Sequence, residues 1–437
     1  MAIIAQRQLF SYKNFGFFSD LERLEFLLKH LPDEKLMRTL ENHRGNGRDD
    51  YPVRAMWNSL LAGLVYKHNS ITSLREELMR NASLLEVCGF DVFKGKRAVP
   101  SADAYTNFLG NLIKFQDEVA EIFYMLVRLV SDNLEGFGTN LAIDSKVIPS
   151  CANRETDKAP DGRRDTDAGW AVKTYTHTDK NGKTYTKTKS IFGYKVHLIV
   201  DADHELPVER KVTPGNVSDI AAAKELLISQ PSPEHQRILD KTQHLMGDKG
   251  YDCGEFKLDL WRKQEIKAVI DTRNLTGGKL KLVEGRDNVL YGQDGKVYCS
   301  SSLTHQKRQM FCAGFEKDRE TLKFRCPAKH CGTECECLKQ CTIGSQVRIK
   351  LESDPRVFMA LSKDSGKWPI FYNKRTSVER VNSRFDVSLG FENHYIRGLG
   401  KMTVMVDLSL IAMLGTAHGC IKEDKKEYMR SLSKVTA

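Results

Sequence analysis

Two short apolar runs in this sequence each lead directly into an aspartate, and they constrain the fold more than any other feature. Leu-Ala-Ile precedes Asp144, and Leu-Met-Gly precedes Asp248. Apolar runs of this length fit buried strands. A carboxylate that follows such a strand emerges at an open edge of the sheet, where ligands bind. Aspartates after strands also cap helices or begin turns, so both interpretations stay open at this point.

The residues between and after the two runs alternate between strand and helix patterns. Strands are predicted at 192–200, 206–212 and 266–270, and helices at 217–229 and 253–264. Such an order predicts a mixed α/β sheet. Asn216 or Ser218 is expected to cap the first helix, Asp219 to cap it rather than bind metal, and His197 to be a core histidine. The charged, Gly- and Thr-rich residues 154–190 predict a mobile loop.

Residues 1–138 predict a helical N-terminal domain. One helix is expected to start at Pro52, because proline is tolerated in a first turn, and another at Ser101. Apolar side chains follow each start at helical spacing. Short helices with tight connections fit a DNA reader of the helix-turn-helix type, and they fit a plain helical bundle equally well.

Changes of composition divide the remaining chain into three parts. Residues 139–271 form the first part of the α/β core. Residues 272–352 interrupt the alternation and contain seven of the eleven cysteines, which predicts an inserted Cys-rich subdomain. Residues 353–437 return to a helical pattern and complete the core.

Two carboxylates that converge at a sheet edge fit magnesium chemistry. Mg²⁺ prefers oxygen ligands and retains several waters. Two such ions, roughly 3.5–4 Å apart, activate the attacking oxygen and stabilise the leaving oxygen in phosphodiester chemistry. Asp144 and Asp248 are therefore candidate ligands.

A third candidate carboxylate, Glu379, lies in the dense basic segment 371–384. Val378, Val381 and Phe385 form one apolar stripe of a helix, and Glu379 points away from that stripe. The alternative is a capping box, in which Thr376 and Glu379 bond each other's backbone amides.

The clustered cysteines are candidate ligands of a structural zinc ion. In a reducing compartment such a cluster indicates metal binding before disulfides. The preferred tetrahedral set is Cys326, Cys331, Cys337 and Cys341, with Cys299, Cys312 and His330 in reserve. The spacings contain no pair of C-x2-C knuckles, so reduced thiols without metal are the alternative.

The chain is basic, with 67 Lys and Arg against 57 Asp and Glu. A positive balance attracts polyanions, of which nucleic acid is the commonest, although a modest excess also serves solubility. The first residues lack the layout of a signal peptide. The apolar stretch 402–419 contains Asp407 and falls short of a clean membrane span. We expect a cytoplasmic protein.

These motifs together resemble the DDE transposases of bacterial insertion sequences, in the group with a Tyr-x2-Arg-x3-Glu-x6-Lys signature. Tyr372, Arg375 and Glu379 match its first three positions, and Asp386 stands where the signature has lysine. LAIDSK and MGDKGYD are similar to the strands that carry the family's two aspartates. GYKVHLIVDADHELPVERKVTPGNVSD and YPVRAMWNSLLAGLVYKHNSITSLREEL also look like family segments. The resemblance covers roughly residues 40–420.

The resemblance implies a ribonuclease H-like core in which Asp144, Asp248 and Glu379 hold two Mg²⁺ (or Mn²⁺) ions. It implies hydrolysis at the element ends and attack of the freed 3′ hydroxyls on target DNA. The expected partners are double-stranded DNA, as inverted repeats and as target, and a second copy in a homodimer. We expect a location at the bacterial nucleoid and no membrane contact.

The resemblance also implies which residues bind DNA. The candidates are Tyr372 and Arg375, with Lys374, Arg384 and Lys249 beside them. The alternative function is that of a DNA-binding descendant that has lost its chemistry. Asp386 favours this alternative, because an acidic group cannot replace a cation on phosphate. The presence of all three carboxylates argues against it.

Overall fold

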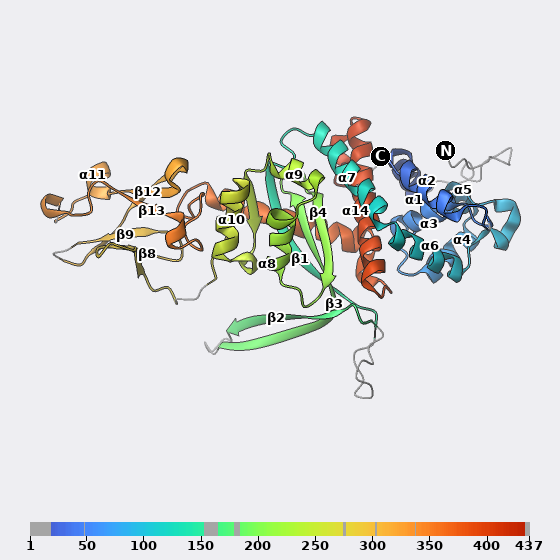
Figure 1. Ribbon diagram of the computed structural model, residues 1–437, viewed down its shortest axis with the longest axis horizontal. Helices are drawn as coiled ribbons and strands as arrows, with labels where there is room; N and C mark the ends of the chain where they lie inside the picture. The colour runs from blue at the N-terminus through green and yellow to red at the C-terminus, as the bar shows by residue number, and fades with distance from the viewer. Residues whose placement is uncertain are drawn as a thin grey trace.

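The computed structural model describes seven stretches of the chain and places a mixed sheet in their middle. The described residues are 19–47, 49–152, 165–178, 184–273, 277–301, 304–336 and 338–432. The N-terminal helices lie at one end of the central sheet, and two small sheets lie at the other end (Figure 1).

The N-terminal part is helical, as the sequence predicts. Its helices are α1 (Ser19–His30), α2 (Glu34–Arg44), α3 (Val53–Val65), α4 (Ile71–Arg80), α5 (Ala82–Cys88), α6 (Ala102–Lys114) and α7 (Gln116–Asn133). The two predicted starts are confirmed, since Pro52 precedes α3 and the Ser101 hydroxyl accepts a hydrogen bond from the Ala104 amide at the start of α6. Helix α3 is buried along nearly its whole length, so the other helices pack around it.

The central sheet combines antiparallel and parallel strands, which confirms the predicted mixed α/β class. Its strands are β1 (Asn140–Pro149), β2 (Gly169–Thr178), β3 (Thr184–Asp201), β4 (Leu206–Pro214), β5 (His244–Gly247) and β6 (Lys267–Ile270). The order is β2-β3-β1-β5-β6, and β4 also pairs with β3. Strands β5 and β6 run parallel to β1, whereas β3 is antiparallel to β1, β2 and β4.

The prediction of a loop over residues 154–190 was wrong for most of the part that the structure describes. Strand β2 and the first half of β3 form a long antiparallel hairpin that projects from the body (Figure 1). Alternating threonines favour strands, because β-branched side chains fit a pleated surface. The first residues of β3, 184–190, are exposed, so their polar composition imitates that of a loop.

The remaining helices cover the central sheet. They are α8 (Asp219–Lys224) with the π-helical η3 (Glu225–Ser229), α9 (Pro233–Leu239), α10 (Gly254–Gln264), α12 (Trp368–Asn373), α13 (Ser377–Ser383) with the π-helical η9 (Arg384–Ser388), and α14 (Leu399–Lys422). Helix α13 packs on β1 and β3, and α12 lies against β5 and β6. Ser218 occupies the N-cap of α8, but its side chain makes no capping bond.

Two small sheets form the far end of the molecule. One contains β7 (Lys281–Leu282), β8 (Val289–Tyr291), β9 (Val297–Ser300) and β10 (Lys307–Gln309), and the other β11 (Phe311–Glu316), β12 (Thr321–Arg325) and β13 (Gln346–Lys350), beside α11 (Pro327–Cys331). They have a hydrophobic cluster of their own, which includes Val289, Phe324 and Ile349. The N-terminal helices and the central sheet share a different, larger cluster.

Short 3-10 helices connect several of these elements, and the one at 92–98 is interrupted by a non-helical Gly95. They are η2 (Val92–Ala98), η4 (Lys249–Tyr251), η5 (Lys317–Arg319), η6 (Leu338–Gln340), η7 (Leu351–Ser353), η8 (Lys374–Thr376), η10 (Phe391–Asn393) and η11 (Lys426–Tyr428).

Helix α14 is the apolar centre of the larger cluster. It is long and apolar enough to cross a membrane, but 89% of its most apolar window is buried inside the fold. It packs against α1, α7 and β4. Burial by the protein itself accounts for its composition, so we assign α14 as a core helix.

A buried group of charges joins α14 to the sheet. The Arg210 guanidinium on β4 donates to an Asp407 carboxylate oxygen of α14 at 2.7 Å and to Glu209 at 3.3 Å. All three side chains are at most 8% exposed. The guanidinium also lies over the rings of Phe123 and Tyr124 of α7, at 4.3 and 5.0 Å. One cation thus holds three elements together.

Replacing this cation is expected to destabilise the protein strongly. Arg210→Met leaves the Asp407 carboxylate buried without a partner and removes the cation beside Glu209, which keeps its hydrogen bond from the Tyr124 hydroxyl. The loss is expected to cost about 3–5 kcal/mol of unfolding free energy. Urea unfolding followed by tryptophan fluorescence measures the loss. Arg262→Met is the matched control, because Arg262 pairs with Glu320 and Glu352 in solvent, and it should cost at most about 1 kcal/mol. Equal losses in both variants would contradict the assignment.

Candidate active site

Asp144 and Asp248 lie side by side at the end of the parallel pairing between the adjacent strands β1 and β5. The ladder between β1 and β5 ends with Ile143 opposite Gly247, and each aspartate is the next residue. The prediction that Asp144 ends its strand was wrong, because β1 continues to Pro149 in antiparallel pairing with β3. The parallel pairing does end there, however, so the two carboxylates meet where the sheet opens.

A third aspartate, Asp271, continues this row. Ile270 ends β6 opposite Gly247 of β5, so Asp271 follows β6 as Asp248 follows β5. Asp271 accepts hydrogen bonds from Lys363 at 2.6 Å and pairs with Lys249 at 3.0 Å. The sequence contains the same signal here as before, an apolar run that ends in aspartate, although Asp271 was not among the predicted site residues.

The environment of Asp144 disfavours its charge. Burial raises the pKa of Asp144 to about 6, and the nearby charges of Asp248 and Asp219 also raise it, although the Ser145 amide opposes them by donating to its Oδ1 at 2.8 Å. The ring of Tyr251 is buried beside the same three carboxylates. Burial and those charges raise the pKa of its phenol well above the usual range.

The two aspartates fit a divalent cation. Each uses one oxygen to accept a backbone amide, from Ser145 and from Gly250, and the second oxygen of each has no hydrogen-bond partner within the described stretches. Carboxylate oxygens are the donors that Mg²⁺ and Mn²⁺ prefer, and a cation relieves the repulsion between like charges. Across the described part of the chain, no group of three His, Cys, Asp or Glu is arranged to hold a metal. Among the described residues, the three predicted ligands Asp144, Asp248 and Glu379 therefore form no such group.

Glu379 lies on α13 and faces outward. Its side chain is 54% exposed and pairs with the Arg375 guanidinium, one turn earlier, at 2.9 Å. Val378 and Val381 are buried beneath it, which confirms the predicted apolar stripe. The alternative of a capping box is wrong, because the Thr376 side chain makes no capping bond.

Tyr372 and Arg375 lie beside the row of aspartates. The Tyr372 ring stacks on Trp368 with centroids 4.5 Å apart, and the Arg375 guanidinium lies 5.6 Å from its centroid. Burial raises the pKa of the Tyr372 phenol, and the charges of Asp271 and Asp248 raise it further. The structure thus places Tyr372, Arg375 and Lys249 in the neighbourhood of Asp248.

Lys374 and Arg384 are engaged elsewhere, at the turn between β3 and β4. Lys374 forms an ion pair with Asp203. Arg384 donates to the backbone carbonyls of Glu205 and Arg430, and burial lowers its pKa to about 10.

The two polar residues expected to play no catalytic part are both engaged in the fold. His197 is fully buried and lies 2.9 Å from the Thr213 hydroxyl, which confirms it as a core histidine. Asp219 accepts a hydrogen bond from Lys195 at 2.9 Å instead of capping α8.

Several of the clustered cysteines lie near one another. Burial raises the pKa of the Cys299 thiol to about 11, and the neighbouring thiols of Cys326, Cys335 and Cys341 raise it as well. Cys331 is exposed, and Cys337 lies outside the described residues. Cys299, held in reserve by the sequence analysis, is therefore closer to the group than its spacing indicates.

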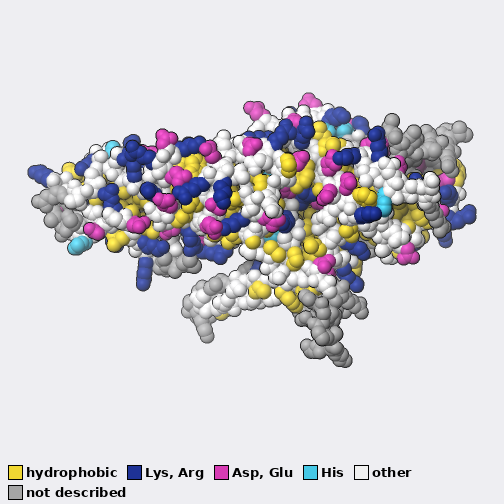
Figure 2. All heavy atoms as spheres, viewed as in Figure 1, with side chains coloured by type: hydrophobic (Ala, Val, Ile, Leu, Met, Phe, Trp, Pro, Cys, Tyr) yellow, Lys and Arg dark blue, Asp and Glu magenta, His cyan; other side chains and the backbone are white. Residues whose placement is uncertain are grey.

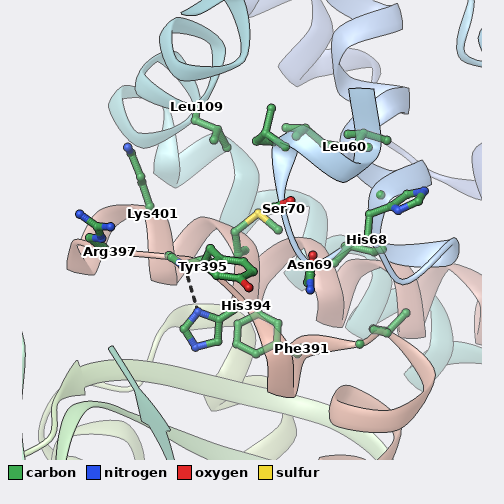
Figure 3. A pocket seen from close by; sticks show the side chains of 18 of the residues that line it. Leu60, His68, Asn69, Ser70, Leu109, Phe391, His394, Tyr395, Arg397 and Lys401 are labelled. Atoms are coloured by element: carbon green, nitrogen blue, oxygen red, sulfur yellow. Dashed lines mark hydrogen bonds between the residues drawn. The ribbon is translucent and has the colours of Figure 1, made fainter. Parts of the chain in front are cut away.

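A separate pocket of about 420 Å³ lies between the N-terminal helices and residues 389–405 (Figure 3). Leu60, Leu109 and Phe391 contribute apolar surface, and Arg397 and Lys401 contribute cations. No Asp or Glu is among the residues that line it, so this pocket offers no carboxylate to a divalent cation.

Comparison with known families adds two matches. Residues 135–414, well over half of the chain, match the family described as "Transposase DDE domain". Residues 15–110 match the family described as "Transposase domain (DUF772)". No curated protein matches the chain significantly. The first match contains Asp144, Asp248 and Glu379, and the second covers most of the N-terminal helices.

Removing the charge of Asp144 is expected to stabilise the metal-free protein at high pH. The folded-state pKa of about 6 exceeds the ordinary value of 3.8, so above pH 6 the folded protein carries a charge that the unfolded chain accommodates better. Asp144→Asn removes this penalty, which is at most about 3 kcal/mol. Below pH 4 the carboxyl is protonated in both states, and the advantage disappears.

Melting temperatures measured from pH 4 to pH 8 in EDTA test this expectation. Asp132→Asn is the matched control, because Asp132 pairs with Arg237 on the exposed surface and the variant should gain no stability at any pH. An Asp144→Asn protein that melts with the wild type at pH 8 would show that the penalty is absent.

Proposed function

Because the chain belongs to the transposase family defined by the DDE domain, we propose that it cuts DNA at the ends of its own mobile element and joins those ends to target DNA. Asp144, Asp248 and Glu379 are the proposed metal ligands, with Mg²⁺ or Mn²⁺ as the cofactor. The adjacent carboxylates of Asp144 and Asp248 at the parallel edge of the sheet carry the proposal.

The sheet order supports a ribonuclease H-like core. Strands β4, β3 and β1 follow one another antiparallel, and β5 and β6 extend the sheet in parallel. We propose residues 139–271 and 353–437 as the two parts of this core and 272–352 as an insertion between them. The separate hydrophobic cluster of the two small sheets supports the insertion. Residues 1–138 would then be the DNA-binding and dimerisation domain.

The proposed reaction needs positioned carboxylates more than reactive side chains. The bound ions supply the activation of water, or of a 3′ hydroxyl, and the stabilisation of the leaving oxygen. Asp144 and Asp248 hold them from the sheet, and Glu379 completes the set from α13. Water first cleaves the strand to leave a 3′ hydroxyl, and that hydroxyl then displaces an oxygen of the target phosphodiester.

Arg375 connects DNA binding to this set. In the structure, its guanidinium forms an ion pair with the Glu379 carboxylate. A phosphate oxygen binds the same guanidinium through two parallel hydrogen bonds. We propose that a phosphate of the DNA backbone replaces Glu379 as the partner of Arg375, which frees the Glu379 carboxylate to bind the metal ions. The Tyr372 ring stacks on an unpaired base at the cleaved end.

Further cations would contact the DNA backbone at a greater distance from the metal ions. Lys249 lies next to Asp248, and Lys374 and Arg384 remain proposed contacts near the β3–β4 turn. Figure 2 shows Lys and Arg side chains spread along the visible face among Asp and Glu, instead of gathered in one patch. With a formal net charge of +10, this distribution fits a long contact with DNA. Two element ends have to be brought together, so we propose that a homodimer acts at the nucleoid.

We also propose a structural zinc ion in residues 272–352. Its ligands are Cys326, Cys337 and Cys341, with Cys331 or Cys299 as the fourth. Small units with a thin core often need such a metal to fold.

Cleavage of element-end DNA tests the proposed function. The wild type is expected to cut duplexes that carry the inverted repeats flanking its gene, at the repeat boundary, when Mg²⁺ or Mn²⁺ is present. Glu379→Gln should still bind the same DNA but cleave it roughly 10³-fold more slowly, because several kcal/mol of charge stabilisation are lost. Gel analysis of end-labelled DNA gives both quantities.

Glu392→Gln is the matched control, since Glu392 is an exposed glutamate outside the site, and it should cleave as the wild type does. Specific binding by the wild type with no cleavage in either metal would instead identify a DNA-binding descendant without chemistry.

Metal analysis tests the zinc proposal. Protein purified under reducing conditions is expected to contain about one zinc per chain. Cys326→Ser should lose it. Comparing Cys299→Ser with Cys331→Ser identifies the fourth ligand, and Cys88→Ser, a buried cysteine of α5, is the control. Wild-type protein without zinc would refute the site.

A further inference from the structure

One ion pair links the helix that carries Glu379 to the strand that carries Asp144. The Lys146 ammonium of β1 contacts the Asp386 carboxylate of η9, the π-helical turn that continues α13. The two side chains are 23% and 17% exposed, so the pair is partly withdrawn from solvent. Water and salt therefore screen it less than an exposed pair.

The two partners have defined positions relative to the proposed metal ligands. Lys146 follows Asp144 by two residues, so both side chains leave the same face of β1. Asp386 follows Glu379 by seven residues, about two turns or roughly 10 Å along the helix. This contact therefore ties the helical segment to β1 at a defined place along the strand.

The helix changes form where this contact is made. Residues Arg384–Ser388 are π-helical, and Phe385 is buried beneath this turn. A π-helical turn inside a longer helix often marks a functional position. Asp386 Oδ1 is buried without a hydrogen-bond partner among the residues that the structure describes. The charge of Asp386 is therefore balanced through its other oxygen, by Lys146.

We propose that the Lys146–Asp386 pair aligns α13 with β1 and so positions Glu379 relative to Asp144. The proposal rests on the proposed function, because it assigns Glu379 to the metal site. Asp386 occupies the position at which the Tyr-x2-Arg-x3-Glu-x6-Lys signature has its lysine. In this chain Lys146 of β1 supplies a cation at this position instead. Both residues are positioning residues, and they act through Glu379.

Exchanging the two charges tests the proposal. Lys146→Asp and Asp386→Lys each place two like charges at the contact, whereas the double variant restores an ion pair with its charges reversed. Each single variant is expected to lower kcat of end cleavage about tenfold or more at unchanged KM for DNA. The double variant should recover most of that loss, since coupled residues are non-additive. Asp386→Asn, of the same shape, should also lower kcat.

A second readout does not depend on DNA cleavage. Mn²⁺ affinity of the metal-free proteins, measured by electron paramagnetic resonance, is expected to fall in both single variants and to return in the double variant. Far-ultraviolet circular dichroism confirms that each protein is folded. Arg380→Gln is the matched control, because it breaks a different ion pair of α13, with Glu205 at 2.7 Å, and the Arg380 side chain is half exposed.

The outcomes separate the two proposals. Three outcomes would overturn the role of the pair. The single variants could cleave as the wild type does, the double variant could cleave no better than either single one, or KM alone could change. A wild type that does not cleave would overturn the proposed function instead. In that case the Mn²⁺ affinities test the positioning role of the Lys146–Asp386 pair. Equal affinities in the wild type, the two single variants and the double variant contradict this role, whereas loss in the single variants and recovery in the double variant support it.

Discussion

The parallel ladder between β1 and β5 is the constraint on which the site depends. It ends with Ile143 opposite Gly247 and leaves Asp144 and Asp248 side by side. Two like charges at partly buried positions repel each other and lose hydration, so they would separate if the chain allowed it. Backbone hydrogen bonds and the surrounding apolar core keep them together. The fold thereby stores an unfavourable arrangement that the proposed divalent cation would relieve.

Two of the cations near this edge are matched to an acid in the structure. Arg375 pairs with Glu379, and Lys249 pairs with Asp271. Under the proposed function, DNA binding at these places would exchange one ion pair for another instead of neutralising a free cation. Such an exchange yields less free energy than its charge count indicates, but it couples the arrival of a phosphate to the release of a carboxylate.

Local patterns predict much of this structure, and long-range contacts account for what they miss. The apolar runs before Asp144 and Asp248 identify strands, because burial and strand length leave a clear local signal. The hairpin of β2 and β3 was missed because its side chains are polar and its stability comes from pairing across the chain. The contact between Lys146 and Asp386 joins residues 240 positions apart, so no local spacing reveals it. Cys299 likewise joins its group only through the folding of the small sheets.

Helix α14 has a consequence for how the protein is made on the ribosome. It begins at Leu399, yet α1, α7 and β4 pack against it. During synthesis, Arg210 and the apolar face of α7 therefore stay without α14 as their packing partner until residues 399–422 have been translated. A nascent or prematurely terminated polypeptide exposes this uncompleted core, where chaperones and proteases act. A chain that stops before α14 therefore lacks the helix on which α1, α7 and β4 pack.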